Sequence, residues 1–281
     1  ENRRISLVGN FNNINQQNFA QQDLLGVTSS GGRGGRGGGG RGGGGNWGGG
    51  GGNFTVGTQA GINRTNAFGV NFSDVWGQKM TVSGSYFFNH SNNNTNQISN
   101  RQYFLSSVPS IADTALRNSN NYNHRINMRM EYRIDSSNQL IITPNLSFQN
   151  NSSNSLTKTI SYLPGSIVSQ TINDVKSETQ GYNLGNNILW RHSFPKRGRT
   201  FSVNLNTSFN KRDGENITDY SETSARRDTA QQRLTDRFND GYNLSSNLVY
   251  TEPIGQKAQL QLNYNPSISR SRGDQQAFVF D

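Results

Sequence analysis

The segment from Gly61 to His90 has a two-residue repeat, which constrains the fold more than any other feature of the chain. On its first arm the apolar residues hold even positions, namely Ile62, Phe68, Val70 and Phe72. On its second arm they again hold even positions, namely Met80, Val82, Tyr86 and Phe88. A period of two is typical of β-strands with one apolar and one polar face. The segment is therefore predicted to be a β-hairpin with a turn at Asp74–Gly77 and arms long enough to cross a bilayer.

The same alternation recurs along the chain and predicts nine strands in all. Besides the two hairpin arms, the expected strands are Arg4–Asn12, Tyr122–Ile134, Leu140–Phe148, Tyr182–Arg191, Phe201–Phe209, Phe238–Tyr250 and Ala258–Ile268. Pro144 cannot donate a backbone hydrogen bond, so we expect a local gap or bulge in its strand. Six aromatic residues are candidates for the membrane–water interfaces: Tyr86, Phe88, Tyr132, Trp190, Tyr250 and Tyr264. The alternative for each is an ordinary place on the apolar face.

The connections between these strands alternate between long and short. Long ones are expected at 13–60, 91–120, 152–178 and 213–236, and short turns at 74–77, 135–138, 194–199 and 251–256. Outer-membrane barrels combine short periplasmic turns with longer extracellular loops, whereas soluble β-sandwiches do not generally gather all long connections at one end. The alternation therefore predicts an all-β, antiparallel up-and-down transmembrane β-barrel with its short turns in the periplasm.

Composition favours such a barrel over a soluble core or a disordered chain. Only 30% of the residues are hydrophobic and 16% are charged, and the mean hydropathy is -0.79. This suffices for a barrel, in which lipid covers one face and water the other. Aromatic residues reach 10%, which is high for a disordered chain. No run approaches the roughly 20 apolar residues of a membrane helix, and the chain has no cysteine for a disulfide or a thiolate metal site.

Two features predict that the chain is part of a larger barrel. Nine strands is an odd number, whereas bacterial single-chain barrels have an even number. The chain also starts at Glu1 without an initiator methionine or signal peptide, and it ends at Phe278–Asp281, where the next outer loop would begin. We therefore expect residues 1–281 to form one partial outer-membrane barrel domain with unpaired edge strands.

A low-complexity segment of glycine and arginine, residues 31–52, lies within the first long connection. Seventeen of its 22 residues are glycine, interrupted by Arg33, Arg36, Arg41, Asn46 and Trp47. Such a segment has large conformational entropy and little to bury, which predicts a mobile outer loop. The Arg-Gly-Gly run and the net charge of +9 also suit a nucleic-acid-binding arm. That function is a distant alternative because the segment has a single aromatic residue, and a nucleic-acid partner is not expected.

No catalytic or metal-binding constellation is apparent, so neither enzymatic activity nor a cofactor is expected. His90, His124 and His192 fall on separate strands or strand ends without a second ligand at suitable spacing. The candidates for functional charge are instead the residues on the polar strand faces that would line the lumen: Arg125, Arg129, Glu131, Arg133 and Arg191. These charges could guide a solute or contact a plug. A generic hydrated wall is the alternative for each of them.

Several segments carry a resemblance to a known family. They are Asn71–Lys79, Gly84–Asn89, Phe194–Thr200 and Tyr250–Gly255, with Ile14–Gly26 ahead of the Gly-rich segment. The chain resembles, over essentially its whole length, the barrel region of Bacteroidota outer-membrane proteins related to TonB-dependent receptors. The resemblance implies a place in the outer membrane, contacts with lipid, with a plug domain of the same protein and with TonB, and uptake of an unidentified solute through a plugged barrel. The alternative is a surface-binding or structural barrel without active transport.

Overall fold

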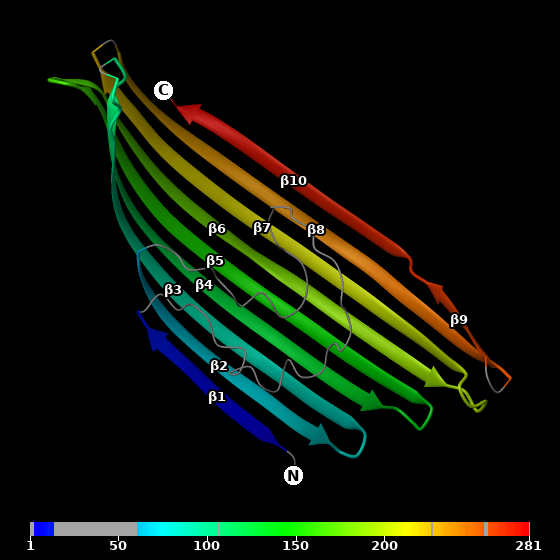
Figure 1. The fold of residues 1–281 in the computed structure, drawn as a ribbon. Coiled ribbons are helices and arrows are strands. Elements are labelled where there is room, and N and C mark those ends of the chain that lie inside the picture. The colour runs from blue at the N-terminus through cyan, green and yellow to red at the C-terminus, as the bar shows by residue number, and fades with distance from the viewer. Residues whose placement is uncertain (1–2, 14–60, 106, 226, 256–257, 281) are drawn as a thin grey trace.

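The chain forms one antiparallel β-sheet (Figure 1). The computed structural model describes residues 3–13, 61–105, 107–225, 227–255 and 258–280. Its strands, in chain order, are β1 (Arg4–Asn12), β2 (Ile62–Trp76), β3 (Met80–Arg101), β4 (Ser110–Arg133), β5 (Asn138–Leu163), β6 (Ser166–Ser193), β7 (Thr200–Ser224), β8 (Asp228–Ile254), β9 (Ala258–Tyr264) and β10 (Ser267–Phe280). The Gly-rich segment 31–52, predicted to be a mobile outer loop, lies outside the described residues.

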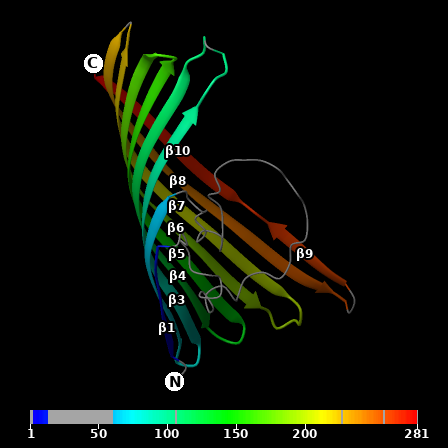
Figure 2. The same cartoon turned by 60° about the vertical axis from the view of Figure 1, so that its left-hand side comes forward.

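The described strands make a single twisted layer that does not close into a barrel (Figure 2). They follow one another up and down in the order β1-β2-β3-β4-β5-β6-β7-β8-β10, with β9 also paired to β8. The prediction of an all-β, antiparallel up-and-down sheet is therefore confirmed, and its shape is consistent with the wall of an incomplete barrel.

β9 and β10 are two parts of one path across the sheet. Tyr264 and Ser267 pair with Leu248 and Ser245 of β8, so the register continues across the break between them. Pro266 causes the break because it has no N–H to donate, although its carbonyl still accepts a hydrogen bond from β8 at 2.9 Å. The ten strands therefore correspond to the nine predicted ones, because β9 and β10 together form the last. β10 continues that strand where an outer loop was expected.

The central strands are much longer than a bilayer requires. β4 to β8 contain 24 to 28 residues each, or roughly 80–90 Å at about 3.3 Å per residue. Crossing a membrane takes only about 9–11 strand residues. The prediction of long connections at 91–120, 152–178 and 213–236 is therefore wrong, because most of these residues extend the strands. The connections that remain are short, at 102–109, 164–165 and 225–227.

Amide contacts between strands explain how such polar segments stay in the sheet. Asn92 Nδ2 donates to Asn120 Oδ1 at 2.8 Å, and Asn118 Nδ2 donates to Asn94 Oδ1 at 2.5 Å, both between β3 and β4. Since the extensions carry polar residues on both faces, they lack the apolar period from which strands are predicted. The backbone ladder continues into them from the amphipathic part of each strand.

The four turns predicted to be short lie together at one end of the sheet, which we call the lower end (Figure 1). The turns at 135–138 and 194–199 are confirmed to within a residue. The first turn is shifted, because Asp74 to Trp76 belong to β2 and the turn is 77–79, where Gly77 has a φ of 65° that favours glycine. The last turn begins after Ile254 rather than at Thr251.

Pro144 leaves a gap in the ladder between β4 and β5, as expected. Residue pairs run to Asn127 with Asn145 and resume at Met130 with Ile142, so the two pairs around the proline are missing. The ladder between β5 and β6 has no gap at this point. The sheet therefore tolerates the proline by losing pairs on one side only.

The two faces of the sheet differ in exposure. We call the face that carries Phe68 the outer face and the face that carries Ala67 the inner face; Phe68 is 40% exposed and Ala67 only 2%. Cross-strand partners share a face, so the registers assign the strand residues to one face or the other. Large apolar side chains remain exposed along the outer face, among them Ile5, Leu7, Ile126, Leu184 and Leu205. Among the described residues only five hydrophobic ones are buried, so the sheet has no conventional core.

Amide hydrogen exchange tests the strand extensions. We expect the amides of 152–160 to exchange at least about 100-fold more slowly than those of the 102–109 turn, because β5 is paired on both sides at this level. Exchange can be followed by mass spectrometry of the detergent-solubilised chain. Equally fast exchange in both segments would contradict the extension of β5 and restore a loop.

Candidate functional site

An apolar belt crosses the outer face next to the lower end of the sheet. Its lower border is a row of residues that pair one with the next from β2 to β6: Trp76, Met80, Tyr132, Leu140 and Trp190. Its upper border is a second such row: Phe68, Phe88, His124, Phe148 and Tyr182. Between the borders the outer side chains are mostly aliphatic, such as Val70, Ile126, Ile142, Leu146 and Ile188.

The belt keeps the same height from strand to strand. Lower and upper border residues lie eight residues apart, as with Tyr132 and His124 on β4 or Trp190 and Tyr182 on β6. Eight residues span about 27 Å along a strand, or roughly 21 Å across a membrane if the strand tilts by about 40°. This is close to the apolar band of about 25 Å on outer-membrane barrels. On the next two strands both borders step two residues toward the lower end and keep their spacing, at Phe201 and Phe209 and at Tyr250 and Tyr242.

Most of the aromatic residues expected at membrane interfaces lie on the borders of the belt. Tyr132, Trp190 and Tyr250 belong to the lower border and Phe88 belongs to the upper border. Tyr86 lies one pair inside the upper border, where its hydroxyl is 2.9 Å from Nδ1 of His124. Tyr264 pairs with Leu248 on the last path of the sheet.

The three histidines lie at or just beyond these borders, which agrees with a structural role. His90 stacks on Tyr122 with ring centroids 4.3 Å apart. His124 is part of the upper border, and His192 lies two residues below the lower border residue Trp190. In the part of the chain that the structure describes, no group of three or more acidic, cysteine or histidine residues could hold a metal ion.

Above the belt the outer face becomes acidic. The carboxylates on this face of β6, β7, β8 and β10 are Asp174, Glu178, Asp213, Glu215, Asp219, Asp228, Asp236, Asp240 and Asp274. Four cations share the face on these strands, namely Lys176, Lys211, Arg270 and Arg272. Glu215 pairs with Glu178 on one side and Asp236 on the other, although like charges in such pairs are destabilising. We call this region the acidic outer surface.

The five charged residues predicted to line a lumen all lie on the inner face, but they do not form one compact site. Arg129 and Glu131 of β4 make an ion pair with 2.6 Å between Nη2 and Oε1. Arg133 and Arg191 lie in one row near the lower end, separated by a single strand. Arg125 lies higher on β4, where it pairs with Phe87 of β3. The structure therefore divides these charges between two strands, β4 and β6, with β5 between them.

Sequence reasoning missed further arginines on the inner face. The registers place six more there: Arg4, Arg101, Arg117, Arg212, Arg233 and Arg237. Arg101, Arg117 and Arg233 fell in segments predicted to be loops, and Arg212 and Arg237 directly flanked one, so no face was assigned to them. In the described strands the inner face thus carries ten arginines, no lysine, and only the carboxylates of Asp113, Glu131 and Glu222. The sequence signal that places these arginines on the inner face is the alternation of side chains between faces, continued from the amphipathic part of each strand into its polar part.

Amide side chains cover much of the inner face at the level of the belt. Asn187 Nδ2 donates to Asn204 Oδ1 at 2.7 Å and to Asn206 Oδ1 at 2.5 Å. Glycine makes room for one such amide, because a Cβ at Gly185 would lie 2.5 Å from the side-chain oxygen of Asn145 on the paired strand. The inner face is therefore polar. It is largely uncharged on β5 and carries arginines at intervals on several other strands.

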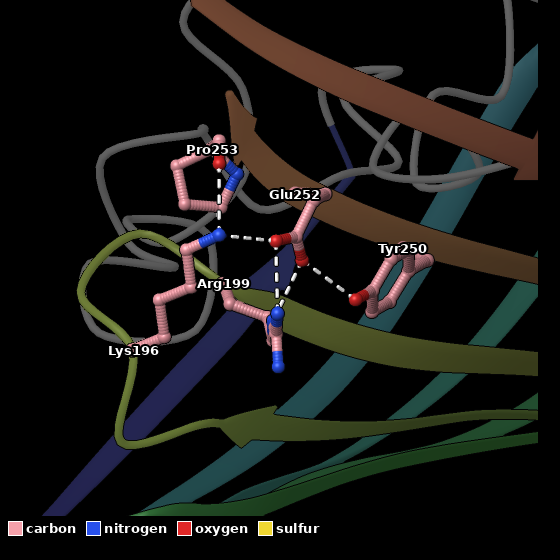
Figure 3. Close-up of polar contacts among 5 residues, drawn as sticks. All are labelled: Lys196, Arg199, Tyr250, Glu252 and Pro253. Carbon is pink, nitrogen blue, oxygen red and sulfur yellow. Dashed lines mark hydrogen bonds and ion pairs between the residues drawn. The ribbon is translucent and has the colours of Figure 1, made fainter. Parts of the chain in front are cut away.

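Glu252 joins two of the turns at the lower end (Figure 3). Its carboxylate accepts hydrogen bonds from Nε and Nη2 of Arg199 at 2.6 and 2.9 Å and from Nζ of Lys196 at 2.5 Å. The Tyr250 hydroxyl donates to it at 2.7 Å, and Lys196 also donates to the Pro253 carbonyl at 3.1 Å. We call these five residues the turn cluster. Two come from the β6–β7 turn and three from the end of β8, so the cluster ties neighbouring hairpins together.

The turn cluster keeps Glu252 ionised. Hydrogen bonds from Arg199, Lys196 and Tyr250, in that order, hold the pKa of Glu252 well below its usual range. The same contact with Glu252 raises the pKa of Arg199. A carboxylate that stays charged at neutral pH is a poor general acid or base, which favours a structural role for the cluster.

No protein-family model matches this chain, and no curated protein matches it. Within the described residues there is no helix long and apolar enough to cross a membrane. The resemblance to TonB-dependent receptors therefore stays a prediction, and the geometry of the two faces carries the functional inference.

Replacing Glu252 with glutamine tests the turn cluster. Because the pKa of Glu252 is depressed in the folded chain, its contribution to stability is present above the pKa of an unfolded glutamate, about 4.3. The contribution is lost as the pH falls below that value toward the folded pKa. We expect Glu252→Gln to lower the unfolding temperature at pH 7, and the difference from the native chain to shrink below about pH 4.

A matched substitution separates this contact from a general loss of charge. Glu215→Gln removes one negative charge from the acidic outer surface, where its cross-strand neighbours are acidic, and we expect no fall in unfolding temperature. A pH-independent difference for Glu252→Gln, or equal destabilisation by both variants, would contradict the role of the turn cluster.

Proposed function

We propose that this sheet is part of the wall of an outer-membrane β-barrel in a protein related to TonB-dependent receptors. The observation that supports it most is the apolar belt, which has constant height and aromatic borders on an exposed face. Extended exposed apolar surfaces mark membrane or protein contact sites. A belt of this height with aromatic rows at both edges suits lipid better than a protein partner.

The inner face supports a role in solute uptake. A barrel wall that faces an aqueous lumen or a plug needs polar side chains at the level of the membrane, and the amides and arginines of the inner face meet that need. In this proposal the partners are outer-membrane lipid, a plug domain of the same protein and TonB, which delivers energy from the inner membrane. The resemblance of the lower turns to those of TonB-dependent receptors supports this class.

The long strand extensions favour a second candidate, a surface-binding barrel without active transport. On β5 the sheet continues for fifteen residues beyond the upper border residue Phe148, to Leu163. Such extensions would stand outside the membrane and offer a large polar surface to a ligand. The two candidates share the membrane wall and differ in whether solute passes through it.

Cysteine labelling tests the membrane wall, and the chain has no native cysteine to interfere. Leu146 and Asn154 lie on the same face of β5, inside and above the belt, and Ser147 lies on the inner face beside Leu146. In a bilayer, we expect an environment-sensitive fluorophore at Leu146→Cys to emit at shorter wavelength and to be quenched by spin-labelled lipid. A fluorophore at Asn154→Cys or Ser147→Cys should show neither effect.

The same three variants in detergent serve as the control for labelling efficiency. Equal quenching at Leu146→Cys and Asn154→Cys would place the bilayer elsewhere and overturn the assignment of the belt. Strong quenching at Ser147→Cys with none at Leu146→Cys would show that the inner face, rather than the outer, contacts lipid.

A further inference from the structure

Arginine lies on both faces of the sheet, whereas lysine is absent from the inner face of the described strands. All ten cations on the inner face of the described strands are arginines. The described lysines lie elsewhere: Lys158, Lys176 and Lys211 on the outer face, and Lys79 and Lys196 in the lower turns. A solvated wall that needs only positive charge could use either arginine or lysine. The use of arginine alone on one face points to recognition by the guanidinium group.

Arginine suits one class of ligand in particular. Its planar guanidinium donates paired hydrogen bonds that match the two oxygens of a carboxylate or the oxygens of a phosphate, whereas lysine acts as a point charge. On the inner face the arginines outnumber the carboxylates of Asp113, Glu131 and Glu222 by ten to three. Even if each carboxylate neutralises one arginine, as Glu131 does for Arg129, the face retains an excess of positive charge.

Three of the arginines form a stepped path along the inner face. A row of paired residues runs from Arg125 of β4 across β5 and β6 to β7, and Arg212 lies on β7 two residues above this row. Arg212 pairs with Asn239 of β8, and Arg237, which pairs with Gly214, lies on β8 two residues above Asn239. Arg212 and Arg237 are thus diagonal neighbours on adjacent strands, about 7–8 Å apart between Cα atoms. Two guanidinium groups at this spacing can reach a single anion.

The opposite face strengthens the contrast. The same strands that carry Arg212 and Arg237 inward carry Asp213 and Asp236 outward, directly next to them in the sequence, and Glu215 points outward two residues beyond Asp213. An anion is therefore repelled from the acidic outer surface and attracted to the inner face of the same strands. Glycine at 214 leaves the space opposite Arg237 free of a side chain.

We infer that the inner face holds a binding path for an anionic solute bearing carboxylate or phosphate groups. Arg212 and Arg237 form its centre, and Arg125 forms the next step toward the lower end. The inference deepens the proposed uptake function and rests on it for the direction in which solute would move. Binding itself is measurable on the chain in detergent.

The test measures binding of pyranine, a fluorophore with three sulfonate groups, to the detergent-solubilised full chain by fluorescence anisotropy. The inner variant combines Arg125→Gln, Arg212→Gln and Arg237→Gln. The matched outer variant removes the same charge through Lys176→Gln, Lys211→Gln and Arg272→Gln. We expect the inner variant to weaken binding about tenfold or more, and the outer variant to change it less than about twofold. Circular dichroism confirms that both variants keep their strand content.

Competition identifies the chemistry of the ligand. Citrate supplies carboxylates and inorganic phosphate supplies phosphate, so the better competitor against pyranine distinguishes the two sources of oxyanion. Equal weakening by the inner and outer variants would show that net charge alone binds the dye and would overturn the inference. Binding unaffected by the inner variant would overturn it as well. Quenching of the Leu146→Cys fluorophore by spin-labelled lipid is an independent readout, so failure of the anion path and failure of the membrane wall are distinguishable.

Discussion

Hydrogen bonding between neighbouring backbones is the interaction on which the rest of this structure depends. The sheet is one layer deep, and it buries too few apolar side chains to be held together by a core. The strands are therefore held mainly by the strands beside them, through ladders that run for more than 20 residue pairs between β3 and β8. In an apolar solvent such ladders are retained because no water competes for their N–H and C=O groups.

The length of the ladders also decides which side chains meet. Because side chains alternate strictly between faces, the parity set by Leu140 and Trp190 in the belt extends upward to residues far outside it. Arg212 and Asp213 consequently point to opposite sides of the sheet although they are adjacent in sequence. One geometric rule thus produces an apolar belt, an acidic outer surface and an arginine-bearing inner face.

Alternation and turn chemistry allowed the lower half of the sheet to be predicted from sequence. Val82, Tyr86 and Phe88 mark a strand because apolar and polar positions differ, and the turn at 194–199 is marked by proline and glycine. The upper half could not be predicted in this way, because segments such as Asn118–Asn121 are polar on both faces and look like loops. The central arginines of the inner face went unnoticed for the same reason, since Arg237 lay at the edge of a predicted loop. The register between strands, which supplies the missing information, is a property of pairs of segments and not of any one of them.

The eight-residue spacing between the borders of the belt limits how the chain can change in length. Inserting one residue between Tyr132 and His124 would turn the side chains beyond it to the wrong face, and inserting two would carry an aromatic ring out of its row. Adding equal numbers of residues to both strands of a hairpin above the upper border would disturb neither parity nor rows. Insertions and deletions are therefore tolerated at the upper ends of the hairpins and excluded from the belt. Related chains can therefore differ in how far their strands extend above the belt, while the part between the two aromatic rows keeps a constant length.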